Sequence, residues 1–204
     1  MPKRFSTQMY LYLLPVSQSV SNETIVPTPT HDGGLEHTAA TFDDATTWIS
    51  KARAGDILLY APQCYLLTLL SQFFQGPAPP DTDASSWYQA QRDKLISFIQ
   101  TVPTSQKRSH PTAQIPWVDK VMSPTSLFEW KSDSRVVLAL DKPGPELANT
   151  GRGGDWDRVV LVRFTKGGST SVKVSSRDDV LREQREAESV SNSEPAGSED
   201  ISKL

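Results

Sequence analysis

Two short runs of nearly the same composition place the strongest constraint on the fold of this chain. Residues 134–140 read SRVVLAL, and residues 157–163 read DRVVLVR. Both runs are rich in β-branched residues, which favour the extended conformation and pack well on a pleated surface. We therefore predict two neighbouring strands in the core of one sheet.

The residues after the second run predict a hairpin. A turn-forming segment, residues 166–169 (KGGS), leads into the alternating run of residues 171–175 (SVKVS). A strand, a short glycine-containing turn and a second alternating run are typical of antiparallel pairing. Ser176 is placed to cap a short charged helix that extends to about residue 189.

The first half of the chain predicts helices. Thr41 and Asp44 have capping-box spacing, and Gly55 suits the left-handed residue that ends a helix. Residues 56–60 (DILLY) are then expected to form a short buried strand. Pro62 suits the first turn of a second helix to about residue 74, whose leucines and phenylalanines cover a wide arc, as in a central core helix.

A third helix is expected from a cap at Asp81 or Asp83 to about Val102, where Pro103 ends it. Residues 104–133 are punctuated by prolines and carry no clear periodicity. Their aromatic side chains are expected to pack at the edge of the sheet: Trp117, Phe128 and Trp130.

Together these elements predict an α+β fold, a small antiparallel sheet packed against two or three helices, with flexible termini. The 204 residues suit one globular domain at residues 41–176. Residues 1–40 are then an N-terminal strand and mobile linker, and residues 177–204 a charged helix and disordered tail. A hydrophobic content of 37% without a membrane-length apolar run predicts no transmembrane segment.

Charge and composition exclude some classes of site. A net charge of −3 with only small basic clusters argues against nucleic-acid binding, which needs a concentrated positive field. No metal site is expected, because His31 and His37 lie in a Ser/Thr/Pro-rich segment without a fixed third ligand. The sequence indicates no cofactor.

The apolar run at residues 9–16 follows Lys3 and Arg4, with no acidic residue before Glu23. We interpret it as a first strand, because Pro15 interrupts it and a small-residue cleavage site is lacking. Two alternatives stay open: a targeting segment, and a surface that binds lipid.

Cys64 is the single cysteine, so an intrachain disulfide is excluded. It lies near the start of the second expected helix, where backbone N–H groups can lower a thiol pKa. With His110 as a base, it could serve a cysteine-dependent hydrolase or acyltransferase. A buried, unreactive cysteine is the more common alternative.

Two segments carry a family resemblance. Gly55-Asp56 precedes an expected strand and helix, and Trp156-Asp157-Arg158-Val159 opens a later strand. This pattern resembles the circularly permuted papain-like superfamily of amidases and lecithin-retinol acyltransferase relatives. The resemblance implies an antiparallel sheet packed on helices, with Gly55, Asp56, Trp156 and Arg158 at family positions.

The chain departs from that family where its chemistry lies. Arg158 stands where the family has its catalytic histidine, and a guanidinium cannot act as a base near neutral pH. No cysteine follows this strand, although the family has its nucleophile there. The resemblance therefore implies a non-catalytic relative that retains a cleft for a ligand or protein partner.

The last three residues, Ser202-Lys203-Leu204, match the C-terminal signal for import into peroxisome-type organelles. A TPR-type import receptor would hold the terminal carboxylate, bury Leu204 and surround Lys203 with acidic groups. The preceding residues are polar and acidic, and such a composition predicts an accessible tail. We expect a peroxisome or glycosome matrix protein, with a cytoplasmic location as the alternative.

Overall fold

The computed structural model describes residues 7, 9–13, 41–74, 76–130, 133–166 and 168–193. Its centre is one antiparallel sheet of four strands in the spatial order β1-β2-β3-β4. The strands are β1 (Thr125–Glu129), β2 (Val136–Leu140), β3 (Asp155–Thr165) and β4 (Gly168–Ser176). The predicted α+β class is confirmed.

The two β-branched runs form the middle of this sheet, as the sequence predicts. β2 and β3 are antiparallel neighbours, and Val137 pairs with Leu161. Val137 and Val160 are fully buried, because helices cover both faces of these central strands. The predicted hairpin is also confirmed, since β4 pairs with β3 and Thr165 faces Gly168 at the turn.

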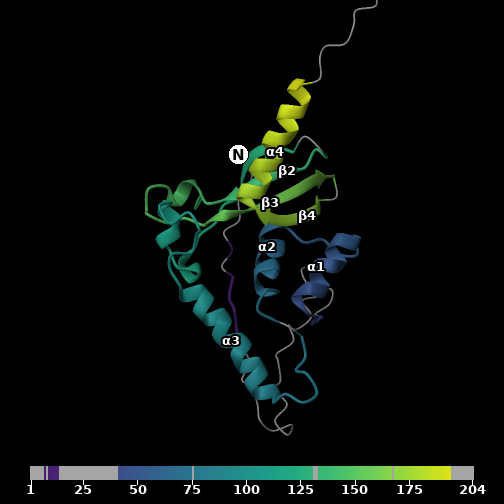
Figure 1. Ribbon diagram of the computed structural model, residues 1–204, viewed down its shortest axis with the longest axis vertical. Coiled ribbons are helices and arrows are strands. Elements are labelled where there is room, and N and C mark those ends of the chain that lie inside the picture. Colours follow the sequence, from purple (N-terminus) through teal and green to yellow (C-terminus); the bar gives the residue numbers. More distant parts are fainter. Residues whose placement is uncertain are drawn as a thin grey trace, which may run out of the picture.

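One face of the sheet packs against α2 (Ala61–Leu70), which Figure 1 shows directly below the strands. Tyr65 and Leu69 project from this helix into the larger hydrophobic core and are almost completely buried. The sheet contributes the remaining buried members of that core: Leu138, Leu140, Val160 and Val162. The second predicted helix is therefore the central core helix, although it ends four residues earlier than expected.

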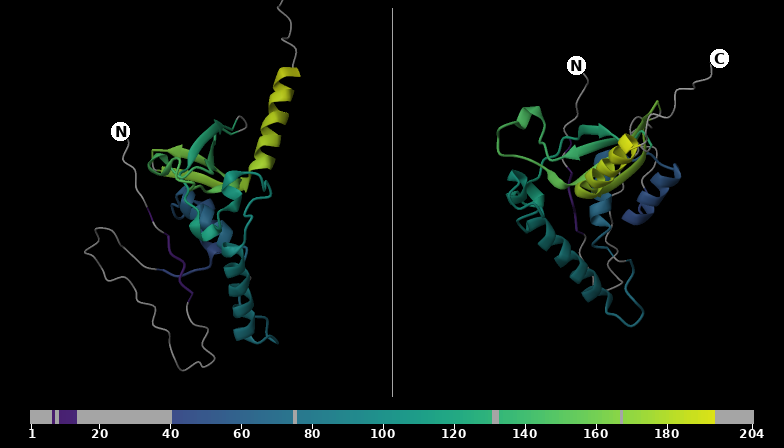
Figure 2. Two further views of the ribbon diagram at one scale, coloured as in Figure 1. Left: turned by 90° about the vertical axis from the view of Figure 1, so that its left-hand side faces the viewer. Right: turned by 45° about the horizontal axis from the view of Figure 1, so that its top comes forward.

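The opposite face packs against the start of α4 (Arg177–Ser193). Val180 joins a second core formed with buried residues of the sheet and of the β1–β2 connection: Trp130, Val137, Val159 and Leu161. Figures 1 and 2 show the rest of α4 projecting away from the sheet, on the side opposite α1 and α2. The expected domain boundary after residue 176 thus falls just before a helical turn that is buried against the domain.

Two further helices flank this framework. α1 (Ala45–Ala54) ends at Gly55, whose φ of 87° is the predicted left-handed conformation. Its N-cap is Asp44, so the helix begins later than the capping box at Thr41 predicted. α3 (Ala84–Gln100) begins at Asp83, whose side chain accepts a hydrogen bond from the backbone N–H of Ser86.

Short 3-10 helices occupy the loops: Pro111–Gln114, Trp117–Asp119 and Pro145–Leu147. They help to fold the irregular region against the sheet. Trp117 stacks on Phe98 of α3 at a ring-centroid distance of 5.3 Å and contributes to the larger core. Trp130 belongs to the second core, and Phe128 lies on the edge strand β1 and packs against that core. The prediction that these aromatics pack at the sheet edge is therefore confirmed for Phe128 and wrong for Trp117, which stacks on α3.

Two strand predictions are also wrong. Residues 56–60 connect α1 to α2 without pairing, and the Leu58 side chain lies against the turn at Gly168. Residues 9–13, the described part of the N-terminal apolar run, form no strand, and Met9 to Tyr12 are exposed. Among the described residues, no helix is both long enough and apolar enough to cross a bilayer.

Candidate functional site

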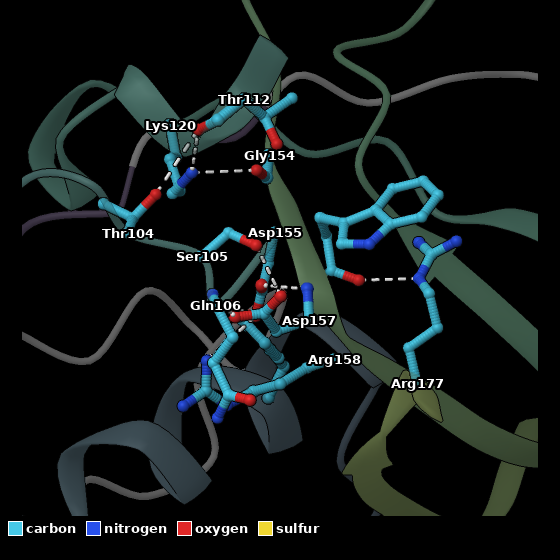
Figure 3. A network of polar contacts seen from close by, with 12 residues as sticks. Thr104, Ser105, Gln106, Thr112, Lys120, Gly154, Asp155, Asp157, Arg158 and Arg177 are labelled. Carbon is cyan, nitrogen blue, oxygen red and sulfur yellow. Dashed lines mark hydrogen bonds and ion pairs between the residues drawn. The ribbon is translucent and has the colours of Figure 1, made fainter. Parts of the chain in front are cut away.

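A network of polar contacts surrounds the start of β3 (Figure 3). Asp155 is the centre of this cluster, with only 1% of its surface exposed. Its carboxylate accepts hydrogen bonds from the Tyr65 hydroxyl at 2.8 Å and from the Asp157 backbone at 2.9 Å. Arg158 adds an ion pair at 3.3 Å. A buried carboxylate needs such partners, and Asp155 has them from α2 and from its own strand.

Asp157 ties an otherwise irregular loop to β3. One carboxylate oxygen accepts a 2.5 Å hydrogen bond from the Ser105 hydroxyl, and the other accepts from the Gln106 backbone at 2.8 Å. The Ser105 oxygen also accepts from the Lys107 N–H at 3.0 Å. These bonds hold the loop after α3 against the strand, as Figure 3 shows.

Trp156 lies between a histidine and two cations. The His110 ring stacks on its indole at a centroid distance of 4.0 Å, and the Arg177 guanidinium lies 3.9 Å from the ring centroid. The Lys107 ammonium lies 5.2 Å away. Arg177 also donates to the Trp156 carbonyl and forms a 2.6 Å ion pair with Asp141. α4 is thereby attached to β3.

The imidazole of His110 caps the first 3-10 helix. Its Nδ1 accepts from the Thr112 backbone N–H at 3.3 Å and lies 2.9 Å from the Thr112 hydroxyl oxygen. An Nδ1 that accepts leaves the proton of the neutral ring on Nε2. Burial lowers the pKa of His110, and the positive charges of Arg177 and Lys107 lower it further against the opposing effect of Asp141.

Lys120 closes the other side of the cluster. Its ammonium donates to the carbonyl oxygens of Thr112 at 2.8 Å and of Gly154 at 2.9 Å. Burial lowers the pKa of this lysine. Figure 3 shows the side chain reaching across from the loop to the strand, where it serves as a cross-link.

The two family-like segments lie in different surroundings. Trp156 and Arg158 both belong to the cluster at the start of β3, and Arg158 lies over the Trp117 ring at 5.8 Å. Gly55 and Asp56 lie in an exposed turn after α1. A Cβ at Gly55 would meet nothing within 4 Å. No described hydrogen bond or ion pair joins the two segments.

Cys64 and His110 also have separate contacts. Cys64 is buried on α2 with its sulfur 3.9 Å from the carbonyl oxygen of Val172 on β4. Burial raises the pKa of its thiol, and Thr68 and Arg53 offset only part of that effect. Among described residues, no hydrogen bond links this thiol to the imidazole of His110.

The predicted targeting residues Ser202, Lys203 and Leu204 lie outside the described residues. His31 and His37, at which we expected no metal site, lie outside them as well. The described part of the chain contains no group of three or more His, Cys, Asp or Glu that could hold a metal ion.

Sequence reasoning missed most of the cluster around Asp155. Tyr65 is 90 residues from Asp155 in the chain, and Ser105 is 52 residues from Asp157. One signal was available: two aspartates flank Trp156 at the start of an otherwise apolar strand, and buried carboxylates need partners from elsewhere in the chain.

Comparisons with protein-family models, with curated proteins and with solved structures each found no significant match. The geometry itself favours a structural cluster. Asp155 and Asp157 each accept several hydrogen bonds, which join α2 and the loop after α3 to β3. Arg177 joins α4 to the sheet through the Trp156 carbonyl and Asp141. It leaves neither Asp155 nor Asp157 as a free base.

Proposed function

We propose that this protein is a non-catalytic binding domain of a peroxisome-type organelle matrix, imported through Ser202-Lys203-Leu204. The tail sequence supports the proposed location, because a TPR-type receptor recognises this tripeptide as an import signal. The non-catalytic part of the proposal is supported by Arg158. This arginine stands where the family that the sequence resembles has its catalytic base, and it pairs with the buried carboxylate of Asp155.

Only one of the two family-like segments supports a pseudoenzyme of the permuted papain-like type. Arg158 lies at the start of a core strand as the resemblance implies, whereas Gly55-Asp56 lies in an exposed turn and no strand follows it. The Arg158 guanidinium is oriented by its ion pair with the buried Asp155 carboxylate, so its role is in the fold. The same position in an active relative would require an imidazole that takes up the proton of the nucleophilic thiol.

The alternative, a cysteine-dependent hydrolase or acyltransferase using Cys64 and His110, gains no support from the described contacts. Burial raises the pKa of the Cys64 thiol, whereas a nucleophilic cysteine needs a lowered one. His110 is engaged by Thr112 and Trp156 instead. We therefore keep the binding domain as the proposal.

Import is tested with the last twelve residues of the sequence fused to a fluorescent protein. The intact fusion should colocalise with an organelle marker, and removing Leu204 should make the signal diffuse. A fusion in which Glu199 and Asp200 are both changed to Ser is the matched control and should still be imported. Diffuse signal from the intact fusion would contradict the targeting proposal.

A further inference from the structure

A polar groove of about 360 Å³ lies between α4 and the neighbouring strands, and none of its lining residues belongs to the cluster around Asp155. Trp130, Leu161 and Val180, which are almost fully buried, contribute its apolar lining. Its charged and hydroxyl-bearing residues come from β4, from α4 and from the residue before β2: Lys173, Ser175, Ser176, Asp179, Arg182, Glu183 and Arg135. The volume is at the small end of the range for sites that bind small molecules.

Two of the three cations in the groove are already neutralised. The Arg135 guanidinium forms an ion pair with Asp133 at 2.7 Å, and Arg182 pairs with Asp179 at 2.6 Å. The Ser176 hydroxyl accepts a hydrogen bond from the Asp179 backbone. These groups already form hydrogen bonds or ion pairs within the protein, so they have little remaining capacity to bond to a ligand.

The remaining groups are of opposite charge. Within the described part of the chain, Lys173 on β4 and Glu183 on α4 form no ion pair, either with each other or with another residue. The Ser175 hydroxyl, on the same face of β4 as Lys173, makes no hydrogen bond to a described residue. One groove thus offers an ammonium, a hydroxyl and a carboxylate that are all available for contact.

We propose that this groove binds a small zwitterion, an amino acid or a short peptide. Its carboxylate would accept from Lys173 and Ser175, and its ammonium would donate to Glu183. Such charge-assisted hydrogen bonds are the stronger ones in proteins. A ligand of this class satisfies both charges at once, whereas a simple anion would leave Glu183 unpaired. This inference rests on the proposed binding function and names its ligand.

Glycylglycine is the probe, titrated into the full chain and followed by amide chemical shifts. The expected result is saturable shifts at Lys173, Ser175 and Glu183, with a Kd of about 1 mM or below. Lys173→Ala and Glu183→Gln should each weaken binding by about tenfold or more, which corresponds to loss of one charge-assisted contact. Lys94→Ala on α3 is the matched control and should bind as the unchanged protein does.

Two ligand controls separate the sources of affinity. N-acetylglycinamide has neither charge and should cause no saturable shift, and acetate should bind far more weakly than glycylglycine. Equal binding of acetate, shifts centred on the cluster around Asp155, or no saturation at about 10 mM glycylglycine would each overturn the inference.

The outcome is independent of import, because the titration uses purified protein and the import assay uses only the tail. If the protein is imported but does not bind glycylglycine, this inference is wrong and the proposed location stands. Stability losses from Lys173→Ala and Glu183→Gln without any ligand effect would assign the two residues to the fold and overturn the binding site.

Discussion

The hydroxyl of Tyr65 donates a 2.8 Å hydrogen bond to the carboxylate of Asp155, and both side chains are 1% exposed. This bond joins the core helix α2 to the first residue of β3. Burial raises the pKa of Tyr65 well above its usual value, and the negative charge of Asp155 raises it further. The phenol therefore stays protonated and keeps donating to the carboxylate.

Replacing Asp155 by Ala should destabilise the protein more than replacing Tyr65 by Phe. Asp155→Ala leaves the buried Tyr65 hydroxyl and the Arg158 guanidinium without their acceptor, a loss of about 1–3 kcal/mol or more. Tyr65→Phe should cost about 1 kcal/mol, because Asp155 keeps its bonds to Arg158 and to the Asp157 backbone. Urea unfolding measures both, with the exposed Asp81→Asn as control. Equal, negligible losses would contradict a structural role for this pair.

Alkaline unfolding should depend on the same pair. A folded-state pKa above the unfolded value means that the native protein holds a proton which the unfolded chain loses above about pH 10. The Tyr65 contribution is therefore complete below that pH and declines as the pH rises through it. Tyr65→Phe should lose less stability between pH 9 and pH 11, which chemical denaturation at each pH would measure. An equal loss of stability with rising pH in the unchanged protein and in Tyr65→Phe would contradict this assignment to Tyr65.

The central strands could be predicted from sequence because their pattern is local. Residues 134–140 and 157–163 are apolar and β-branched whatever their partners, so the pairing of β2 with β3 followed directly. β1 was missed because it is a polar edge strand, with Leu127 exposed and a register shift between Ser126 and Phe128. Residues 56–60 have a strand-like pattern, but only tertiary packing decides whether a partner strand is present.

The protein should lose stability as the pH falls below about 6.5, because of His110. Its folded-state pKa lies below the ordinary value, so the unfolded chain takes up the proton first. The contribution of the neutral ring is complete above pH 6.5 and declines as the pH falls towards the folded-state pKa. Protonation also removes the acceptor for the Thr112 N–H. Denaturant midpoints at pH 7.5 and 5.5 would show the decline.

His110→Asn is the matched variant for this effect. An asparagine can cap the 3-10 helix through its side-chain oxygen but does not titrate, so the pH dependence should become shallower. The double variant His31→Asn/His37→Asn controls for the other two histidines and should keep the original slope. A slope that disappears in this control and persists in His110→Asn would assign the effect elsewhere.

Gly154→Ala should destabilise the start of β3. A Cβ there would overlap the backbone oxygen of Leu140 and come within 2.5 Å of a Met122 side-chain carbon. Overpacking of this kind costs about 1–3 kcal/mol, and more where backbone must move. Gly151→Asn is the control: its φ of 74° suits asparagine, and the space around it is open. In thermal unfolding, the melting temperature of Gly154→Ala should lie well below that of Gly151→Asn.

The candidate site was predictable only in part. Trp156 and Arg158 were identified by their position at the start of a strand, and both lie in the polar cluster. Tyr65, Ser105 and Arg177 bond to Asp155, Asp157 and Trp156 and come from two helices and a loop. The sequence signals that the two aspartates need partners, but it does not say which residues supply them. Asp56 shows the limit of the motif, because it resembles a family position and lies in an exposed turn.

Cys64 should react slowly with a thiol reagent in the folded protein. Cys64 is 3% exposed, and its sulfur lies 3.9 Å from the carbonyl oxygen of Val172. Burial raises the pKa of the thiol, so little thiolate is present at neutral pH. Labelling at pH 7.5 should therefore be slower than in the urea-unfolded chain by about 100-fold or more, since it requires an opening of the core. Arg53→Gln controls for the nearby positive charge and should leave the rate low. Rapid labelling of the native protein, slowed by His110→Asn, would instead favour the cysteine-dependent enzyme.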